Sequence, residues 1–226
     1  MLAKSILGLA IEMAIFGGCL LLPAPTWAWR RAWIFLGVIL VASVATLLTV
    51  FRGQPGLLDE RFKPPLQKGQ PRADKVVLLL FLAAFPGLLV FIPLDVFRLH
   101  LLGGPGPLGS SLGLGLVLAG WLIIALAFRE NAFAAPVVRH QAERRHAVVD
   151  TGVYGVVRHP LYAGAVLLLA GMPLWLTSWA AFLLASVPAG LLLARILVEE
   201  RFLRRALPGY EAYMARVRYR LVPFLW

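Results

Sequence analysis

The sequence predicts an all-α fold, a polytopic membrane helix bundle. Hydrophobic residues make up 60% of its 226 residues and charged residues only 15%, and the mean hydropathy is +0.81. Soluble domains carry about 25% charged residues, whereas several long runs of this chain contain few charges or none. This combination is typical of an integral membrane protein whose helices cross the bilayer several times.

The long apolar runs define the predicted spans. In chain order, these runs cover residues 5–22, 33–51, 76–94, 109–128 and 161–198. The last run is interrupted near Thr177 and is long enough for two helices, 161–175 and 179–197. At about 1.5 Å per residue, each rises about 22–28 Å, so the pair forms a hairpin that returns to the side where it began. The prediction is six spans, with five as the alternative.

The first run is expected to remain in the protein as a helix rather than to be cleaved as a signal peptide. Lys4 is its only basic residue, Glu12 interrupts it, and Leu21-Leu22-Pro23-Ala24 is a poor cleavage site. An acid within a span is costly and often functional, yet a protonated or interhelically bonded Glu12 would be purely structural. Glu12 is therefore left outside the predicted site.

The segments between the runs predict the orientation. Residues 52–75 are rich in Pro, Gly and charge, as an interfacial loop is, and residues 99–110 predict a short turn at the opposite face. With the N-terminus inside, 18 Lys and Arg residues lie on one side, and only Arg30, Arg31 and Arg98 lie on the other. The positive-inside rule then places both termini in the cytosol.

The opposite interface is marked by Trp27, Trp29 and Trp33 beside Arg30 and Arg31. Tryptophans and basic residues at this depth predict an anchoring belt in contact with membrane lipids. The Ala-, Leu- and Arg-rich composition points to a bacterium, so the expected location is the bacterial inner membrane.

Charge and cysteine content exclude several classes of function. The net charge of +11 is attributed to topology and to anionic lipids, and nucleic acid is not an expected partner. Cys19 is the only cysteine, so neither an intramolecular disulfide nor a Cys-rich metal site is expected. Phe224-Leu225-Trp226 is not a prenylation box. Gly113 and Gly115 lie within a predicted span with no strand before them, which favours close helix packing over dinucleotide binding.

Polar side chains of the second half gather on the expected cytosolic side. Because the last two spans form a hairpin, Arg158 and His159 begin it at the level where Glu199 and Glu200 end it. Pro160 suits the first turn of a helix, whose free N–H groups attract an anion. The alternative is that the Arg-His pair anchors the interface and the glutamates form local salt bridges along their helix.

Three motifs follow one another in this region: RHPxYxG at residues 158–164, EExxL at 199–203 and GYxxY at 209–213. In this order and at these distances, they resemble the isoprenylcysteine carboxyl methyltransferase family of membrane enzymes, with its phospholipid methyltransferase relatives. The resemblance covers residues 129–222, and Gly152-Val153-Tyr154 replaces the Gly-Pro-Tyr common in relatives. It divides the chain into N-terminal spans, residues 1–128, and a methyltransferase-like region, residues 129–226.

The resemblance implies S-adenosylmethionine as methyl donor, bound in a pocket formed by the C-terminal hairpin and the cytosolic tail. It also implies a lipophilic acceptor, such as an isoprenylcysteine-like carboxylate or a lipid headgroup, and direct in-line transfer. The expected cofactor-binding residues are Asn131, Tyr154, Arg158, His159, Pro160, Tyr162, Gly164, Glu199 and Glu200. Among them, Arg158, His159 and Glu200 are the expected catalytic residues.

The cofactor's chemistry agrees with this set, because its groups need cationic donors, carboxylate acceptors and aromatic faces together. Arg158 and His159 are assigned to its carboxylate, and Glu199 or Glu200 to its ammonium or ribose hydroxyls, with the tyrosines shaping the wall. Asn131 is either a hydrogen-bond partner of the adenine or a cap at a helix end.

Two other functions remain open from the sequence. Membrane sterol reductases share a similar C-terminal scaffold and bind a nicotinamide dinucleotide, but they are usually longer, and this chain has no extra basic cluster for a 2′-phosphate. A transporter or scaffold would use the Arg/His/Glu cluster structurally, but the spans lack the paired broken helices expected of a transporter. Cofactor binding distinguishes the three functions.

Overall fold

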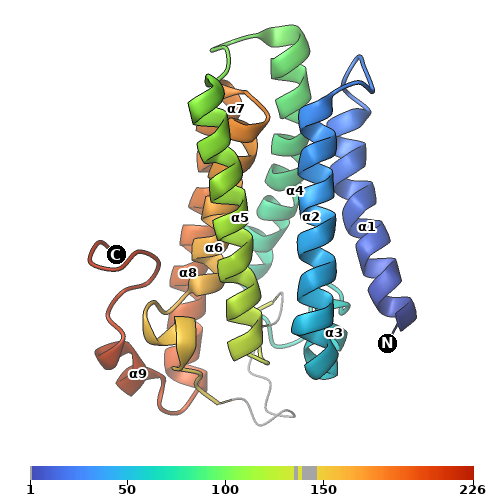
Figure 1. Cartoon of the computed structure of the whole chain (residues 1–226). Helices are drawn as coiled ribbons and strands as arrows, with labels where there is room; N and C mark the ends of the chain where they lie inside the picture. Colours follow the sequence, from blue (N-terminus) through green and yellow to red (C-terminus); the bar gives the residue numbers. More distant parts are fainter. Residues whose placement is uncertain (1, 135–136, 139–146) are drawn as a thin grey trace.

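The computed structural model describes residues 2–134, 137–138 and 147–226, and this part of the chain contains helices and loops but no strand. The helices are α1 (Leu2–Leu21), α2 (Arg30–Thr49), α3 (Pro55–Arg61), α4 (Arg72–Leu94), α5 (Pro107–Glu130), α6 (Pro160–Trp175), α7 (Trp179–Leu184), α8 (Ser186–Ala206) and α9 (Tyr210–Arg216). Short turns are η1 (Phe51–Gly53), η2 (Asp95–Leu99) and η4 (Gly152–Gly155). The long helices lie side by side, with α3 and α9 near one end (Figure 1). The expected all-α bundle is confirmed.

The helices agree with the predicted spans. Among the described residues, five segments are long and apolar enough to cross a membrane: Ala3–Leu21, Arg30–Gly53, Arg72–Leu99, Pro107–Glu130 and Trp179–Ala206. The apolar helix α6 has 16 residues and rises about 24 Å, which is shorter than a full span. The bundle therefore has five full spans and one short apolar helix, which fits the predicted range.

The last predicted helix, 179–197, begins at Trp179 as expected but is interrupted and ends later than predicted. It begins as the short helix α7, and α8 then continues to Ala206. The break arises near Pro188, which has no N–H to donate to the preceding turn. The extension beyond residue 197 is rich in Glu, Leu and Arg, which are good helix formers, so the helix persists where its side chains become polar.

Glycines bring α5 and α6 into close contact. A Cβ atom on Gly120 would lie 2.5 Å from the Gly164 carbonyl oxygen, and one on Gly113 would lie 2.5 Å from the Trp175 backbone nitrogen. Backbones that approach this closely leave no room for a side chain, as is usual where small residues join membrane helices. The packing role expected for Gly113 is observed. Gly115 does not share it, because a Cβ atom there would have no neighbouring atom within 4 Å.

Gly120→Leu is expected to destabilise the bundle by at least about 1–3 kcal/mol, because the new side chain meets the backbone of α6 rather than a flexible neighbour. Thermal unfolding in one detergent measures the effect. Gly115→Leu is the matched control on the same helix, and equal melting temperatures for the two variants would contradict the proposed contact.

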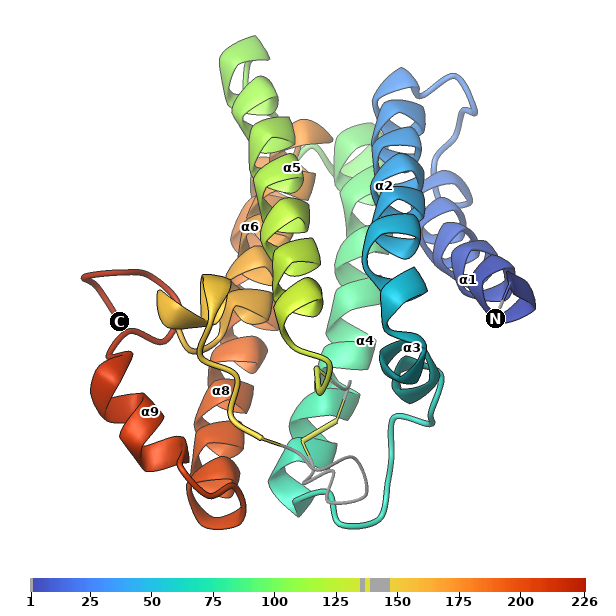
Figure 2. The same cartoon turned by 60° about the horizontal axis from the view of Figure 1, so that its bottom comes forward.

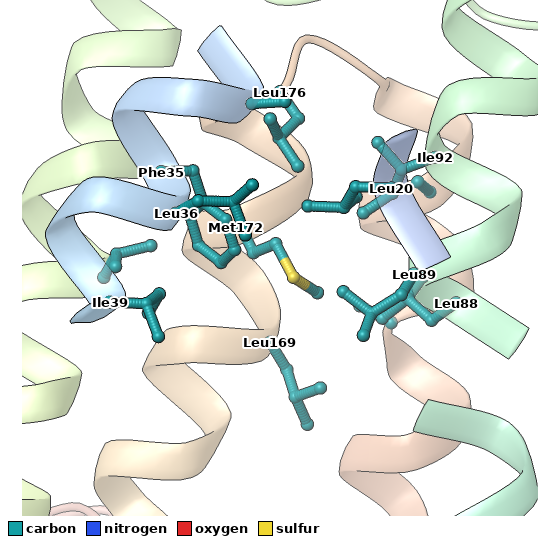
Figure 3. Close-up of a cluster of buried hydrophobic side chains, with 14 of the residues drawn as sticks. Leu20, Phe35, Leu36, Ile39, Leu88, Leu89, Ile92, Leu169, Met172 and Leu176 are labelled. Carbon is teal, nitrogen blue, oxygen red and sulfur yellow. The ribbon is translucent and has the colours of Figure 1, made fainter. Parts of the chain in front are cut away.

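The main hydrophobic core lies between α1, α2, α4 and α6. Figure 3 shows side chains from these helices pointing toward one another, with Met172 of α6 near the centre. Its members include Leu20, Phe35, Leu36, Ile39, Leu88, Leu89, Ile92, Leu169, Met172 and Leu176. The N-terminal helices thereby support α6, the helix that begins at the RHPxYxG motif.

The end of the bundle away from α9 is fixed by polar contacts. Asp95 accepts hydrogen bonds from the Ser178 hydroxyl at 2.6 Å and from the Leu101 backbone N–H at 3.0 Å. Trp27 is exposed, as an anchoring belt requires, but Trp29 is buried against Phe97, with ring centroids 5.1 Å apart. Trp29 is therefore a core residue rather than a belt residue, because its ring faces the bundle.

Glu12 is bonded between helices. The Ser43 hydroxyl of α2 donates to Glu12 Oε2 of α1 at 2.6 Å. This bond agrees with the structural alternative for Glu12, since it provides a partner for an acid inside a span.

Candidate active site

A pocket lies where the ends of α5, α6 and α8 meet η4 and α9, at the end shown coming forward in Figure 2. Its polar and aromatic lining residues are Asn131, Tyr154, Arg158, His159, Tyr162, Glu199, Tyr210 and Tyr213. Its apolar lining residues include Phe133, Val137, Val138, Val148, Leu161, Leu203 and Leu207. Six of the nine predicted cofactor residues line this single pocket.

Glu200 stands behind the pocket wall at the centre of an ionic cluster. Its Oε1 accepts from Arg158 Nε at 2.8 Å and lies 3.3 Å from His159 Nε2, and its Oε2 accepts from Arg220 Nε at 2.9 Å. The carboxylate is only 4% exposed, so these partners replace the water that burial removes. The predicted meeting of the Arg-His pair with a glutamate is observed, although Glu200 itself does not line the pocket.

Arg158 connects the ionic cluster to the C-terminal tail, residues 217–226. Its Nη1 donates to the carbonyl oxygens of Val217 and Arg218 at 2.7 and 2.8 Å. The backbone N–H groups of Arg158 and His159 donate to the Tyr219 and Arg220 carbonyl oxygens, each at 2.9 Å. Arg158 thus donates hydrogen bonds to the tail from both its backbone and its side chain. These bonds hold the tail against the start of α6.

Glu199 faces the pocket from α8. Its Oε2 accepts from the Tyr162 hydroxyl of α6 at 2.7 Å, so two helices of the predicted hairpin meet here. Adjacent glutamates therefore point to different surroundings, one into the pocket and one into the ionic cluster. A carboxylate held at one oxygen by a phenol can accept further hydrogen bonds from a ligand.

Three buried tyrosines form an aromatic wall. Gly209, with φ of 83°, begins α9, and Tyr210 and Tyr213 lie one turn apart on that helix with ring centroids 5.7 Å apart. The Tyr213 hydroxyl donates to the Tyr154 carbonyl oxygen at 2.8 Å. Burial raises the pKa of each of the three phenols well above its ordinary value, so all three stay neutral at physiological pH.

Asn131 has the helix-end role that was one of the two alternatives left open by the sequence. It is the C-cap residue of α5, and its side-chain oxygen accepts from the Phe133 backbone N–H at 2.8 Å. It also lines the pocket. The Asn131 carbonyl oxygen is used by Phe133, and the side chain also hydrogen-bonds Tyr154, so a remaining amide N–H is the group suited to a ligand.

Pro160 and Gly164 do not line the pocket. Pro160 occupies the first turn of α6, as predicted, with His159 as the N-cap residue. Gly164 meets α5, where an added Cβ would lie 2.5 Å from the Gly120 carbonyl oxygen. The structure gives both residues a role in placing α6 rather than a place beside a ligand.

Asp74 was not predicted from the sequence. It lies in the first turn of α4, has no exposed surface, and accepts from Arg195 Nε at 2.8 Å and from the Val138 backbone N–H at 3.1 Å. The sequence feature that could have indicated this pair is an acid near the start of one span together with an arginine inside another. Such residues pair because an isolated charge within a membrane is costly. Through Val138, the N-terminal half of the chain holds one wall of the pocket.

The model of one protein family, described as phospholipid methyltransferase, matches residues 108–208. The phospholipid methyltransferase segment runs from α5 to the end of α8 and contains every predicted site residue, while Tyr210 and Tyr213 follow just after it. The match confirms the family resemblance seen in the motifs, and a comparison with curated proteins gives no match. Together with the apolar helices, this match supports an integral membrane methyltransferase.

Proposed function

We propose that the protein transfers a methyl group from S-adenosylmethionine to a lipophilic acceptor at the membrane boundary. The observation that carries this proposal is one pocket, within and beside the family segment, that combines Glu199, His159 and a wall of neutral tyrosines. The charge count supports a cytosolic position for this pocket and for both termini, and the Ala-, Leu- and Arg-rich composition supports a bacterial inner membrane.

The lining residues fit the chemical groups of the cofactor. Glu199 has acceptor capacity for an ammonium or for ribose hydroxyls, and the Asn131 amide nitrogen suits a ring nitrogen of adenine. Tyrosine faces attract a sulfonium cation as they attract other cations. The first turn of α6, where Leu161 and Tyr162 line the pocket, favours a carboxylate because a helix N-terminus carries a partial positive charge.

S-adenosylmethionine supplies an activated methyl group, so transfer proceeds by direct displacement without a covalent enzyme intermediate. The protein contributes position and exclusion of water. Apolar residues such as Val138 and Leu203 keep water from the reacting groups, and the Tyr162 bond holds Glu199 in one orientation. Orientation and desolvation of this kind supply several kcal/mol of rate acceleration.

The acceptor's chemistry decides whether a base is needed. An isoprenylcysteine-like carboxylate needs none, whereas the amine of a lipid headgroup loses a proton. His159 is the candidate base, because a neutral ring that donates from Nε2 to Glu200 keeps a lone pair on Nδ1. The tail of either acceptor can stay in the bilayer, since the pocket lies at the ends of membrane-crossing helices.

Calorimetric titration of the detergent-purified protein with S-adenosylhomocysteine, beside NADPH, tests the proposed cofactor. Saturable binding of S-adenosylhomocysteine alone is expected, with loss of binding in His159→Ala because His159 lines the pocket. Binding of NADPH would favour the sterol-reductase-like alternative. Binding of neither ligand would favour a non-enzymatic role for the cluster.

Glu12→Gln is expected to leave the dissociation constant for S-adenosylhomocysteine unchanged. Glu12 lies on α1, which contributes no residue to the pocket, and a glutamine can still accept from Ser43. The same titration measures it, and a large loss of affinity would show that the site extends to α1.

A further inference from the structure

The C-terminal tail forms a compact loop with an apolar tip. Phe224 is 88% exposed and Leu225 80% exposed, whereas Leu221 belongs to the main hydrophobic core. An apolar tip that projects from the surface marks a site of contact with another apolar phase. Two aromatic contacts support the loop: the rings of Tyr219 and Phe224 lie 5.3 Å apart, and the Arg220 guanidinium lies 5.0 Å from the Trp226 ring.

The tail lies at the depth of the membrane-crossing helices. In Figure 1 it runs beside the lower half of α8, above α9 and above the lower end of α5, and it faces away from α1. The Arg220 contact with Glu200 fixes this height, and Leu197 and Leu193 lie on the same face of α8, one and two turns earlier respectively. Both leucines are 38% exposed, so the tip continues a lipid-facing surface.

The loop also satisfies most of its own backbone N–H groups. The N–H groups of Arg220, Leu221 and Val222 donate to the Trp226 carbonyl oxygen at 2.8–3.2 Å, and those of Leu225 and Trp226 donate to the Val222 carbonyl oxygen. Pro223 has no N–H to satisfy. A segment that enters lipid needs such internal partners, because hydrocarbon offers none.

We propose that the tip of the tail, Val222 to Trp226, inserts into the lipid leaflet on the pocket side of the membrane. The exposed apolar surface of the tip contacts the layer between the lipid headgroups and the first acyl carbons. Trp and Tyr rings are favoured in this layer, and an Arg side chain there extends outward to the phosphates. Since Arg158 and His159 bind the same tail through Tyr219 and Arg220, insertion holds the pocket wall at headgroup depth.

Fluorescence quenching at single labelled cysteines tests the insertion. Cys19 is replaced by alanine, and the full chain then receives one cysteine at Phe224, at Leu225 or, as the control on α9, at the exposed Ala215. Each variant carries an environment-sensitive fluorophore and is reconstituted into phosphatidylcholine and phosphatidylglycerol vesicles. Quenchers are a nitroxide on the lipid acyl chain and aqueous iodide.

At positions 224 and 225, the acyl-chain nitroxide is expected to quench most of the fluorescence, and iodide is expected to quench little of it. At position 215, iodide is expected to quench most of the fluorescence and the nitroxide little. Iodide quenching at 224 and 225 that equals the quenching at 215, without a nitroxide effect, would overturn the proposal. Leu225 is exposed and makes no ring contact, so its substitution leaves the loop's support intact, whereas a cysteine at Phe224 also removes the contact with the Tyr219 ring. The measurement does not depend on methyl transfer, so its result tests the insertion independently of the proposed function.

Discussion

Glu200→Gln is expected to abolish binding of S-adenosylhomocysteine and to lower the free energy of unfolding by about 3–5 kcal/mol, the usual effect of breaking a buried ion pair. The substitution keeps the volume but removes the charge that Arg158 and Arg220 share. It also turns an amide N–H₂ toward one of the two guanidinium groups. The tail then loses its attachment at Arg220, and the start of α6 loses the contact that orients His159.

Glu199→Gln is the matched control, one residue earlier on the same helix. Its glutamine can still accept from Tyr162, so the free energy of unfolding is expected to change far less than in Glu200→Gln. Ligand affinity is expected to fall by about tenfold or more, because a charged acceptor is replaced by a neutral one. Thermal unfolding and calorimetry on both variants separate the two effects. Equal losses of stability would contradict the different surroundings of the two glutamates.

Asp74→Ala is expected to cost about 3–5 kcal/mol of stability, because it removes the fully buried carboxylate to which Arg195 donates. The Val138 N–H also loses its acceptor, so affinity for S-adenosylhomocysteine is expected to weaken although Asp74 lies outside the family segment. Thermal unfolding and calorimetric titration in the same detergent measure both changes.

Two comparisons make the Asp74 result interpretable. Asp74→Asn keeps one acceptor oxygen for Val138 but loses the charge and the second acceptor, which Arg195 uses, so its affinity loss should be smaller than that of Asp74→Ala. Asp59→Ala removes the exposed pair with Lys4, whose side chains are each 56% exposed, and should change stability little. An Asp74→Ala variant as stable as Asp59→Ala would exclude the proposed anchoring of the pocket wall.

The spans were predictable because hydropathy is a property of the chain itself. Any run long and apolar enough to cross a bilayer must do so as a helix, whatever packs beside it. The helix α8 shows the limit of this reasoning, since it continues past residue 197 into charged turns that hydropathy assigns to the tail. Helix formation there depends on backbone bonding and on partners such as Arg158, which hydropathy does not describe.

The approach of Arg158 and His159 to a glutamate was also predictable, because a hairpin brings the start of one helix to the level of the end of the next. The choice between adjacent glutamates was not. A rotation of about 100° per residue separates Glu199 and Glu200 around α8, so one faces Tyr162 and the other faces Arg158. Sequence spacing gives depth along the helix, whereas the packing of α8 against α6 decides which face is turned to the pocket.

The sequence by itself determined the membrane class, the positions of the helices and the family motifs, since each depends on residues close together in the chain. Only the tertiary structure decided that Gly164 contacts α5, that Arg158 holds the tail, and that Asp74 supports the wall at Val138. These contacts join residues 44 to 64 positions apart in the chain, from Gly120 to Gly164 and from Asp74 to Val138. Such partners are selected by the relative rotation and depth of packed helices, which no local pattern contains.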